Sequence, residues 1–283
     1  MLLSHPSPAG QRPVGLSIRP NQASPQAKNL IAWWPLAAPQ KKVFDAAWGR
    51  YPSVGVTPEA GWVSAPSPGG WAARFDGSAY WNWGDQAAFD FGSDAIFAIS
   101  CWAWFTGATP SLQICKREIL DTGYDLLYAP NAVSGELRAR VQVDVSAVAS
   151  ADATGLDDGN YHHVLFGYDG ANTVLIVDGG RFSSFVSNPN VSGVSNTTAF
   201  QLGARAGTAI WTGRMFDVRV YLRAPTLSLA SQMYNPATRW QLYQVPSRRY
   251  WLDAPAAAPA GGRIWKLAGY GGGLVGDARG LVA

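Results

Sequence analysis

Charged residues, sulfur-containing residues and long apolar runs are all scarce in this sequence. Only 14% of its 283 residues are charged, and no run of Lys and Arg is dense enough to neutralise several phosphates, which argues against nucleic-acid binding. No stretch approaches the ~18 consecutive apolar residues of a membrane-spanning helix. The N-terminal segment lacks the basic and apolar regions of a signal peptide, so we expect a protein made in the cytoplasm, with no membrane partner.

Cysteine occurs only at Cys101 and Cys115. If residues 96–105 and 112–119 form a hairpin, the two side chains face each other across it, and a disulfide is geometrically possible. Without an export signal, two reduced and packed thiols are the better interpretation.

Turn-forming and aromatic residues are abundant instead, with 31 Gly, 19 Pro and 13 Trp. Short apolar segments between residues 30 and 222 are separated by pairs such as Asp169-Gly170 and Asp178-Gly179, which supply the positive φ that hairpin turns need. Many short strands at this spacing predict an all-β sandwich or barrel. One short helix is expected over residues 225–234.

Composition divides the chain into three parts. Residues 1–29 are rich in Pro, Ser and Gln without periodicity and predict an extended N-terminal arm, residues 30–245 predict the sandwich, and residues 246–283 form a Gly/Ala/Pro-rich tail. The first arm has three basic residues and no acid (+3), the tail has five against two (+3), and residues 30–245 have 14 against 17 (−3). Basic arms are suited to acidic surfaces of neighbouring subunits.

The tail contains the residues that we expect to bind a partner. Buried aromatic and aliphatic side chains often carry most of the energy of an interface, and arginines pair with acidic groups across it. The predicted partner-binding residues are Arg248, Arg249, Trp251, Ile264, Trp265, Leu267 and Tyr270.

Several motifs follow one another in the order of a laminin-G-like, concanavalin A-like domain. Phe75-Asp-Gly-Ser-Ala-Tyr80 resembles the family's F-D-G-x-x-Y strand, and Phe97-Ala-Ile-Ser-Cys-Trp102 resembles F-T-I-S-x-W. Asp158-Gly-Asn-Tyr-His-His-Val164 is similar to D-G-x-W-H-H-V, with Tyr161 in place of Trp. The resemblance spans roughly residues 30–245 and implies a jelly-roll β-sandwich.

The closing segment, residues 233–243, resembles the end of laminin-G-like proteins encoded among bacteriophage structural genes. The resemblance implies a virion protein, such as a capsid decoration or cement protein or a head appendage. Such a protein would dock through its arms on major capsid or appendage subunits, form a homo-oligomer, and reside in the virion.

The same fold family includes glycoside hydrolases, which carry Glu-x-Asp-x-Glu on one strand because hydrolysis needs two carboxyl groups flanking the scissile bond. This sequence has three glutamates, Glu59, Glu118 and Glu136, and none has another within five residues. We therefore expect no catalytic residues and no enzyme activity.

Metal binding has weak candidates. His162 and His163 are adjacent, and neighbouring residues of a strand point to opposite faces, so one core and one surface histidine are expected rather than a metal site. Some members of the resembled family bind calcium through loop carboxylates. The turn acids Asp76, Asp85, Asp169 and Asp178 could contribute to such a site, although turn formation also explains them. No other cofactor is expected.

A second function is open, that of a carbohydrate-binding receptor module on a tail fibre or spike. Sugar binding needs exposed aromatic platforms beside polar groups, and the candidates are Trp81, Trp83 and Trp211, with Tyr80 beside them. Alternation puts Trp81 and Trp83 on one face, opposite Tyr80, so one of the two sets must face the core. Packing in the core or in an interface is the alternative role for these tryptophans.

Overall fold

The computed structural model describes residues 20–36, 45–47, 55–56, 61–68, 70–92, 96–117, 122–129, 132–142, 148–188, 191, 193–205, 209–243, 265–266 and 275–276. The chain divides into two units, Ala9–Gln244 and a smaller unit that joins residues 1–8 with 245–283. In the smaller unit the structure describes one antiparallel pair, β16 (Trp265–Lys266) and β17 (Val275–Gly276). The larger unit is called the body.

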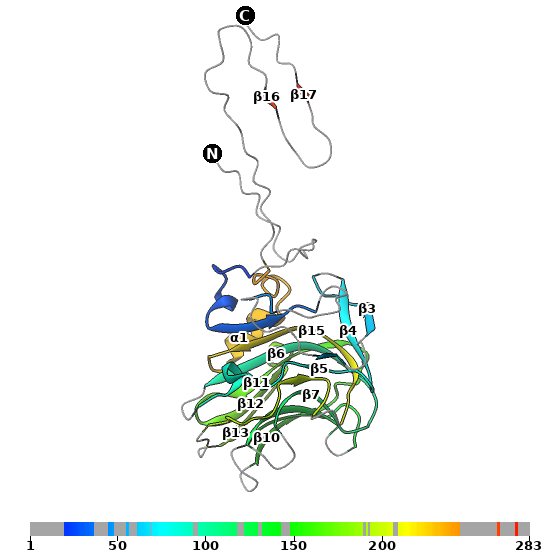
Figure 1. Cartoon of the computed structure of the whole chain (residues 1–283), viewed down its shortest axis with the longest axis vertical. Helices are drawn as coiled ribbons and strands as arrows, with labels where there is room; N and C mark the ends of the chain where they lie inside the picture. The colour runs from blue at the N-terminus through cyan, green and yellow to red at the C-terminus, as the bar shows by residue number, and fades with distance from the viewer. Residues whose placement is uncertain are drawn as a thin grey trace, which may run out of the picture. The chain divides into compact units, whose positions relative to one another are not determined.

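Two antiparallel sheets form the body (Figure 1). The larger sheet has the order β13-β12-β11-β6-β15-β4-β3, and β1 also pairs with β15. Its strands are β1 (Leu30–Trp34), β3 (Gly61–Ser64), β4 (Trp71–Asp76), β6 (Phe97–Phe105), β11 (Tyr161–Tyr168), β12 (Asn172–Val177), β13 (Phe182–Ser187) and β15 (Thr212–Tyr221).

The smaller sheet has the order β10-β9-β8-β7-β14-β5-β2. Its strands are β2 (Gly55–Val56), β5 (Trp81–Asn82), β7 (Ser111–Lys116), β8 (Gly123–Tyr128), β9 (Leu137–Gln142), β10 (Val148–Ala153) and β14 (Gln201–Leu202). Non-sequential strand neighbours in both sheets fit the jelly-roll sandwich, so the predicted all-β fold class is confirmed.

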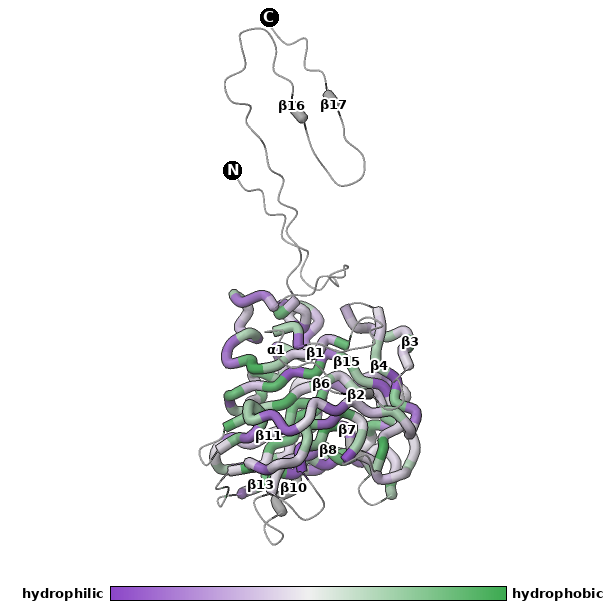
Figure 2. The backbone as a smooth tube through the Cα atoms, in the orientation of Figure 1, coloured by the Kyte–Doolittle hydropathy of each residue, from purple (hydrophilic) through white to green (hydrophobic). Residues whose placement is uncertain are grey.

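Aromatic side chains between the sheets build much of the core, and hydrophobic residues run along the strands of both sheets (Figure 2). Phe97 of β6 stacks on Phe91 at 4.2 Å and lies 5.0 Å from Tyr124 of β8. Phe105, at the other end of β6, stacks on Tyr128 at 5.0 Å. Odd-numbered residues of β6 therefore face the smaller sheet, and even-numbered residues face outward.

The predicted hairpin between residues 96–105 and 112–119 is wrong, because β6 and β7 belong to different sheets. β6 is already paired with β11 on one edge and β15 on the other, which leaves no edge for β7. Cys101 and Cys115 are both free and buried, as the second interpretation expected. Burial raises the pKa of both thiols, that of Cys115 to about 12.

Residues 20–29, assigned from the sequence to the arm, pack on the body instead. Pro20 forms a bridge with Tyr243, and the 3₁₀ turn η1 (Pro25–Ala27) is capped by the Ser24 hydroxyl. Gln26 is fully buried, which composition alone did not indicate. Its amide donates to the carbonyl oxygens of Gln232 (3.0 Å) and Thr238 (2.8 Å), so the body extends at least to Pro20.

The expected helix is α1 (Leu227–Tyr234), and two further 3₁₀ turns are η2 (Ala87–Phe89) and η3 (Asp178–Gly180). The Thr226 hydroxyl caps α1 by accepting from the amide of Leu229 at 3.2 Å. Leu229, Ala230 and Met233 are buried, while Tyr234 stays exposed. No helix among the described residues is long and apolar enough to cross a membrane.

Candidate functional site

A row of large side chains crosses four neighbouring strands on the outward face of the larger sheet. The register sets Tyr161 of β11 opposite Trp104 of β6, Trp104 opposite Arg214 of β15, and Arg214 opposite Arg74 of β4. Residues directly opposite one another on paired strands share a face. We call Tyr161, Trp104, Arg214 and Arg74 the outer row. Arg74 is exposed and the other three side chains are half-buried.

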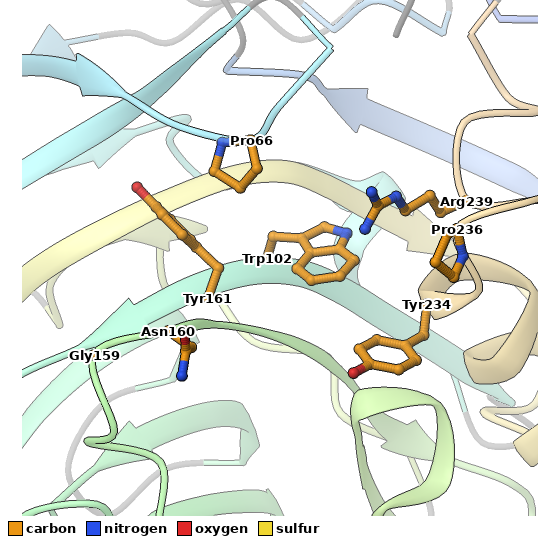
Figure 3. A pocket seen from close by; sticks show the side chains of 8 residues that line it. All are labelled: Pro66, Trp102, Gly159, Asn160, Tyr161, Tyr234, Pro236 and Arg239. Atoms are coloured by element: carbon orange, nitrogen blue, oxygen red, sulfur yellow. The ribbon is translucent and has the colours of Figure 1, made fainter. Parts of the chain in front are cut away.

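Beside the outer row lies a hollow of about 390 Å³, here called the Trp102 hollow (Figure 3). Tyr161 and Tyr234 flank the Trp102 indole on two sides, and the Arg239 side chain reaches toward the indole from a third. The volume falls within the range of about 300–1,000 Å³ typical of small-ligand pockets. The hollow is lined by Pro66, Trp102, Gly159, Asn160, Tyr161, Tyr234, Pro236 and Arg239.

Trp102 is a rigid floor because other rings fix it from several sides. It lies parallel to Phe216 of β15, with centroids 5.9 Å apart and 3° between the planes, and nearly parallel to Tyr234 at 5.9 Å and 18°. The Arg239 guanidinium lies 5.9 Å from its centroid. Trp102 is only 5% exposed, whereas Tyr234 is 39% exposed, so Tyr234 is the more accessible ring.

A buried network supports the turn that carries Arg239. Arg219 of β15 makes an ion pair with Asp217 at 2.6 Å, and both side chains are almost fully buried. Arg219 also donates to the side-chain oxygen of Gln26 at 2.7 Å and to the main-chain oxygen of Arg239 at 3.4 Å. The N-terminal segment and the turn after α1 are thereby tied to the same strand beneath the Trp102 hollow.

The loop at the rim, which holds Gly159 and Asn160, is anchored by a histidine. His162 lies 3.0 Å from an oxygen of Asp158 and 2.8 Å from an oxygen of Asp178. Burial opposes protonation, but the two carboxylates outweigh it and raise the pKa of His162. The Asp158 carboxylate also accepts a hydrogen bond from the main-chain amide of Asn160 at 2.9 Å, which orders the rim.

His162 and His163 point to opposite faces, as alternation predicts, but both are 2% exposed. The expectation of one surface histidine is therefore wrong. The outward face is covered at this point, where the ring of His163 lies 5.4 Å from that of Trp102. Burial, together with the charge of Arg219, lowers the pKa of His163 to about 3.

The four turn acids considered for calcium have separate roles. Asp76 and Asp169 accept hydrogen bonds from residues of their own turns, Ser78 and Ala171 respectively. Asp178 binds His162, and Asp85 binds Lys116. No group of three or more His, Cys, Asp or Glu able to hold a metal occurs among the described residues.

Lys116 of β7 is a buried cation with several oxygen partners. Its ammonium lies 2.9 Å from Asp85 and 3.0 Å from Asp90, and the side chain is 0% exposed. It also donates to the main-chain oxygens of Thr198 (2.8 Å) and Asn196 (3.2 Å). A lysine thus supplies the positive charge among these carboxylate and carbonyl oxygens.

The proposed glycan platforms Trp81, Trp83 and Trp211 lie in the core, with 1%, 0% and 0% exposure, so this prediction is wrong. Trp83 packs 4.7 Å from Trp34, while Trp81 and Trp211 pack on Phe75 at 5.4 Å and 5.1 Å. Trp81 and Trp83 are the set that faces inward, and no ring face remains for a sugar.

The predicted tail residues Arg248, Arg249, Trp251, Ile264, Leu267 and Tyr270 lie outside the described residues. Trp265 lies in β16, where it pairs with Gly276. Sequence reasoning did not identify the Trp102 hollow. The available signal was that Trp102 ends the segment resembling F-T-I-S-x-W, and that Tyr161 replaces the Trp of the segment similar to D-G-x-W-H-H-V. The proximity of the two residues, however, depends on the pairing of β6 with β11.

Solved structures share this fold at low sequence identity. The binding domain of Paraclostridial Mosquitocidal Protein 1 matches with a TM-score of 0.59 and 13% identity, over 74% of this chain and 52% of that chain. The binding domain of Botulinum Neurotoxin DC, solved in complex with SialylT, matches with a TM-score of 0.55 and 9% identity, over 74% and 52%. The chain thus spans about half the length of these toxin binding domains.

Domain 4 of AbnA, a GH43 extracellular arabinanase from Geobacillus stearothermophilus, was solved in complex with arabinotriose. It matches with a TM-score of 0.56 and 16% identity, over 74% of this chain and 98% of the domain. At these identities the likeness shows the fold alone. No curated protein sequence matches the chain.

Residues 75–228 match the family model described as the Concanavalin A-like lectin/glucanases superfamily. This span is more than half of the chain and runs from the end of β4 to the start of α1. It includes Trp102, Trp104 and Tyr161. The chain therefore belongs to the concanavalin A-like lectin/glucanases superfamily.

Proposed function

We propose that this protein is a carbohydrate-binding module that attaches to a glycan-bearing receptor through the Trp102 hollow. The observation that carries the proposal is the combination of an immobile aromatic floor, an exposed second ring at Tyr234, and polar groups from Asn160 and Arg239 in one hollow of about 390 Å³. The superfamily and the binding domains of similar fold support it.

The chemistry of the hollow suits a sugar ring. One face of a pyranose presents C–H groups, which pack on an aromatic ring, while its hydroxyls need donors and acceptors at the edge. The accessible ring of Tyr234 supplies the apolar contact. The side chains of Asn160 and Arg239 supply the hydrogen bonds, each of which contributes about 0.5–1.5 kcal/mol.

Binding without turnover is part of the proposal. Glycoside hydrolysis requires two carboxyl groups on either side of the scissile bond. Among the described residues that line the Trp102 hollow, none is Asp or Glu. A sugar held there meets aromatic rings, amides and a guanidinium, and these groups bind but do not protonate and attack a glycosidic bond.

The test is binding of the full chain to a glycan array, followed by titration of the best ligand. We expect Tyr234→Ala to weaken binding about tenfold, equivalent to about 1.4 kcal/mol, because the accessible ring is lost. Leu227→Ala is the matched control, since Leu227 lies on the same helix, is 48% exposed, and does not line the hollow. Absence of any glycan ligand, or equal loss in both variants, would refute the proposal.

The virion role expected from the sequence stays a prediction. The similar structures named above are toxin binding domains and a domain in complex with arabinotriose, which favours the carbohydrate-binding alternative. Residues 233–243, which carry the phage resemblance, contribute Tyr234, Pro236 and Arg239 to the hollow. A glycan-binding module on a tail fibre or spike would reconcile the two ideas, and immunogold labelling of purified particles would test it.

A further inference from the structure

We infer that the ligand of this surface is an anionic saccharide, whose carboxylate or sulfate is bound by the arginines of the outer row. The inference rests on the proposed function, because it specifies the class of sugar that the Trp102 hollow and the outer row bind together. Tyr161 belongs to both, so the two features form one continuous surface.

The arginines of the outer row differ in their partners from four other arginines of the body. Four described arginines lie in ion pairs with aspartates, namely Arg117, Arg138, Arg140 and Arg219. Among the described residues, neither Arg74 nor Arg214 is in an ion pair within 4.0 Å. No carboxylate of the described residues therefore neutralises their positive charges.

Arg214 also lies against an aromatic ring of the same row. Its guanidinium lies over the Trp104 ring, 4.4 Å from the centroid. A guanidinium that stacks on a ring with its flat face keeps the N–H groups in its plane for other partners. The Tyr161 hydroxyl is one such partner, and we infer that an anion of the ligand is another. The N–H groups form a planar fork that matches the two oxygens of a carboxylate or sulfate.

Among the described residues, the positive charges of this surface outnumber the negative ones. Burial raises the pKa of the Tyr161 phenol, against the opposing effect of Arg214, so its hydroxyl stays neutral. Of the described residues, two aspartates lie near this surface. Asp76 accepts from Ser78 in its own turn, and Asp158 accepts from Asn160 and lies beside His162. The guanidiniums of Arg74, Arg214 and Arg239 bring three positive charges to the same surface.

A saccharide fits this surface better than an acidic peptide because the aromatic part is one compact hollow and the cationic part is a row that extends from it. The Trp102 hollow is a single compact site with the size of a small-ligand pocket. The outer row extends from it across β6, β15 and β4. This arrangement suits one ring in the hollow with an acidic group directed along the row.

The experiment compares pairs of oligosaccharides that differ in one acidic group, such as a sialylated and the corresponding asialo glycan, or a uronic acid and the corresponding neutral hexose. Binding of the full chain is titrated at low and high salt. We expect at least about tenfold preference for the acidic member at low salt, and a smaller preference at high salt because exposed charges are screened.

Arg214→Gln should abolish the preference, because the affinity for the acidic member falls to that for the neutral member. Arg181→Gln is the matched control, because Arg181 also lies over a ring, that of Phe182 at 5.3 Å, but outside the outer row. Arg214→Lys should restore only part of the preference, because a lysine keeps the charge without the fork.

The outcomes separate the two proposals. Equal binding of both members, or preference for the neutral one, would overturn the anionic inference and leave the carbohydrate-binding function intact. Binding of an acidic peptide and of no saccharide would overturn both. If Arg214→Gln failed to fold, the wild-type preference and its salt dependence would decide the question.

Discussion

The ammonium of Lys116 offers a direct test of how this sandwich is held together at one edge. In a Lys116→Met variant the aliphatic packing is largely kept, but the positive charge is removed from a fully buried position. Asp85 and Asp90, together with the main-chain oxygens of Thr198 and Asn196, then lose their common donor. Lys116 connects the smaller sheet to the two loops that hold these partners. Its loss should therefore destabilise the whole body.

The magnitude follows from the exposure of the partners. Removing one member of a buried ion pair destabilises a protein by about 3–5 kcal/mol. The side chains of Asp85 and Asp90 are 44% and 18% exposed, so water can replace part of what they lose, and the lower end applies. We expect about 3 kcal/mol. For a body of this size that corresponds to a decrease in Tm of roughly 6–12 °C.

Urea unfolding and differential scanning calorimetry would measure the change. Lys28→Met is the control, because Lys28 is exposed, and its effect should stay within about 0.5 kcal/mol. In the double variant Lys116→Met/Asp90→Asn the destabilisation should be smaller than the sum of the single effects. The neutral amide of Asn at position 90 needs no counter-charge when the lysine is absent. A Lys116→Met protein as stable as the wild type would refute the reasoning.

Two further predictions concern calcium and pH. Because Lys116 already supplies the charge beside Asp85, and the other turn acids have their own partners, adding Ca²⁺ or EDTA should change the Tm of the wild type by less than about 1 °C. A larger stabilisation by Ca²⁺ would show a site that these contacts do not account for. The folded pKa of His163, about 3, lies below its ordinary value of 6.5, so the unfolded chain binds a proton that the folded chain does not. Stability should therefore fall as the pH decreases from 6.5 toward 3, by up to about 1.4 kcal/mol per pH unit from this group. His163→Leu should reduce that slope in urea titrations at pH 7, 6 and 5, and an unchanged slope would contradict the assignment.

Local patterns in the sequence were sufficient for the fold class. The segment that contains Phe97 and Trp102 begins β6, and the segment that contains Tyr161 begins β11. Alternation correctly separated Trp81 and Trp83 from Tyr80, but it could not tell which set faces the core. That choice depends on the position of the second sheet, which is a property of the whole chain.

The candidate site could not be predicted from the sequence for a related reason. Arg74, Trp104, Tyr161 and Arg214 are far apart along the chain and become neighbours only through the pairing of β4, β15, β6 and β11. No local period relates them. The buried role of Gln26 was hidden in the same way, since its partners lie near the other end of the body.

The pairing of Pro20 with Tyr243 has a consequence for how the body can be carried by a longer chain. The amide of Asn21 donates to the carbonyl oxygen of Leu242 at 2.6 Å, so the polypeptide enters and leaves the described body at adjoining residues. Domains with neighbouring ends can be inserted into a host loop with little distortion of either partner. A host protein in which two chain ends lie side by side could therefore carry the body without separating Pro20 from Tyr243.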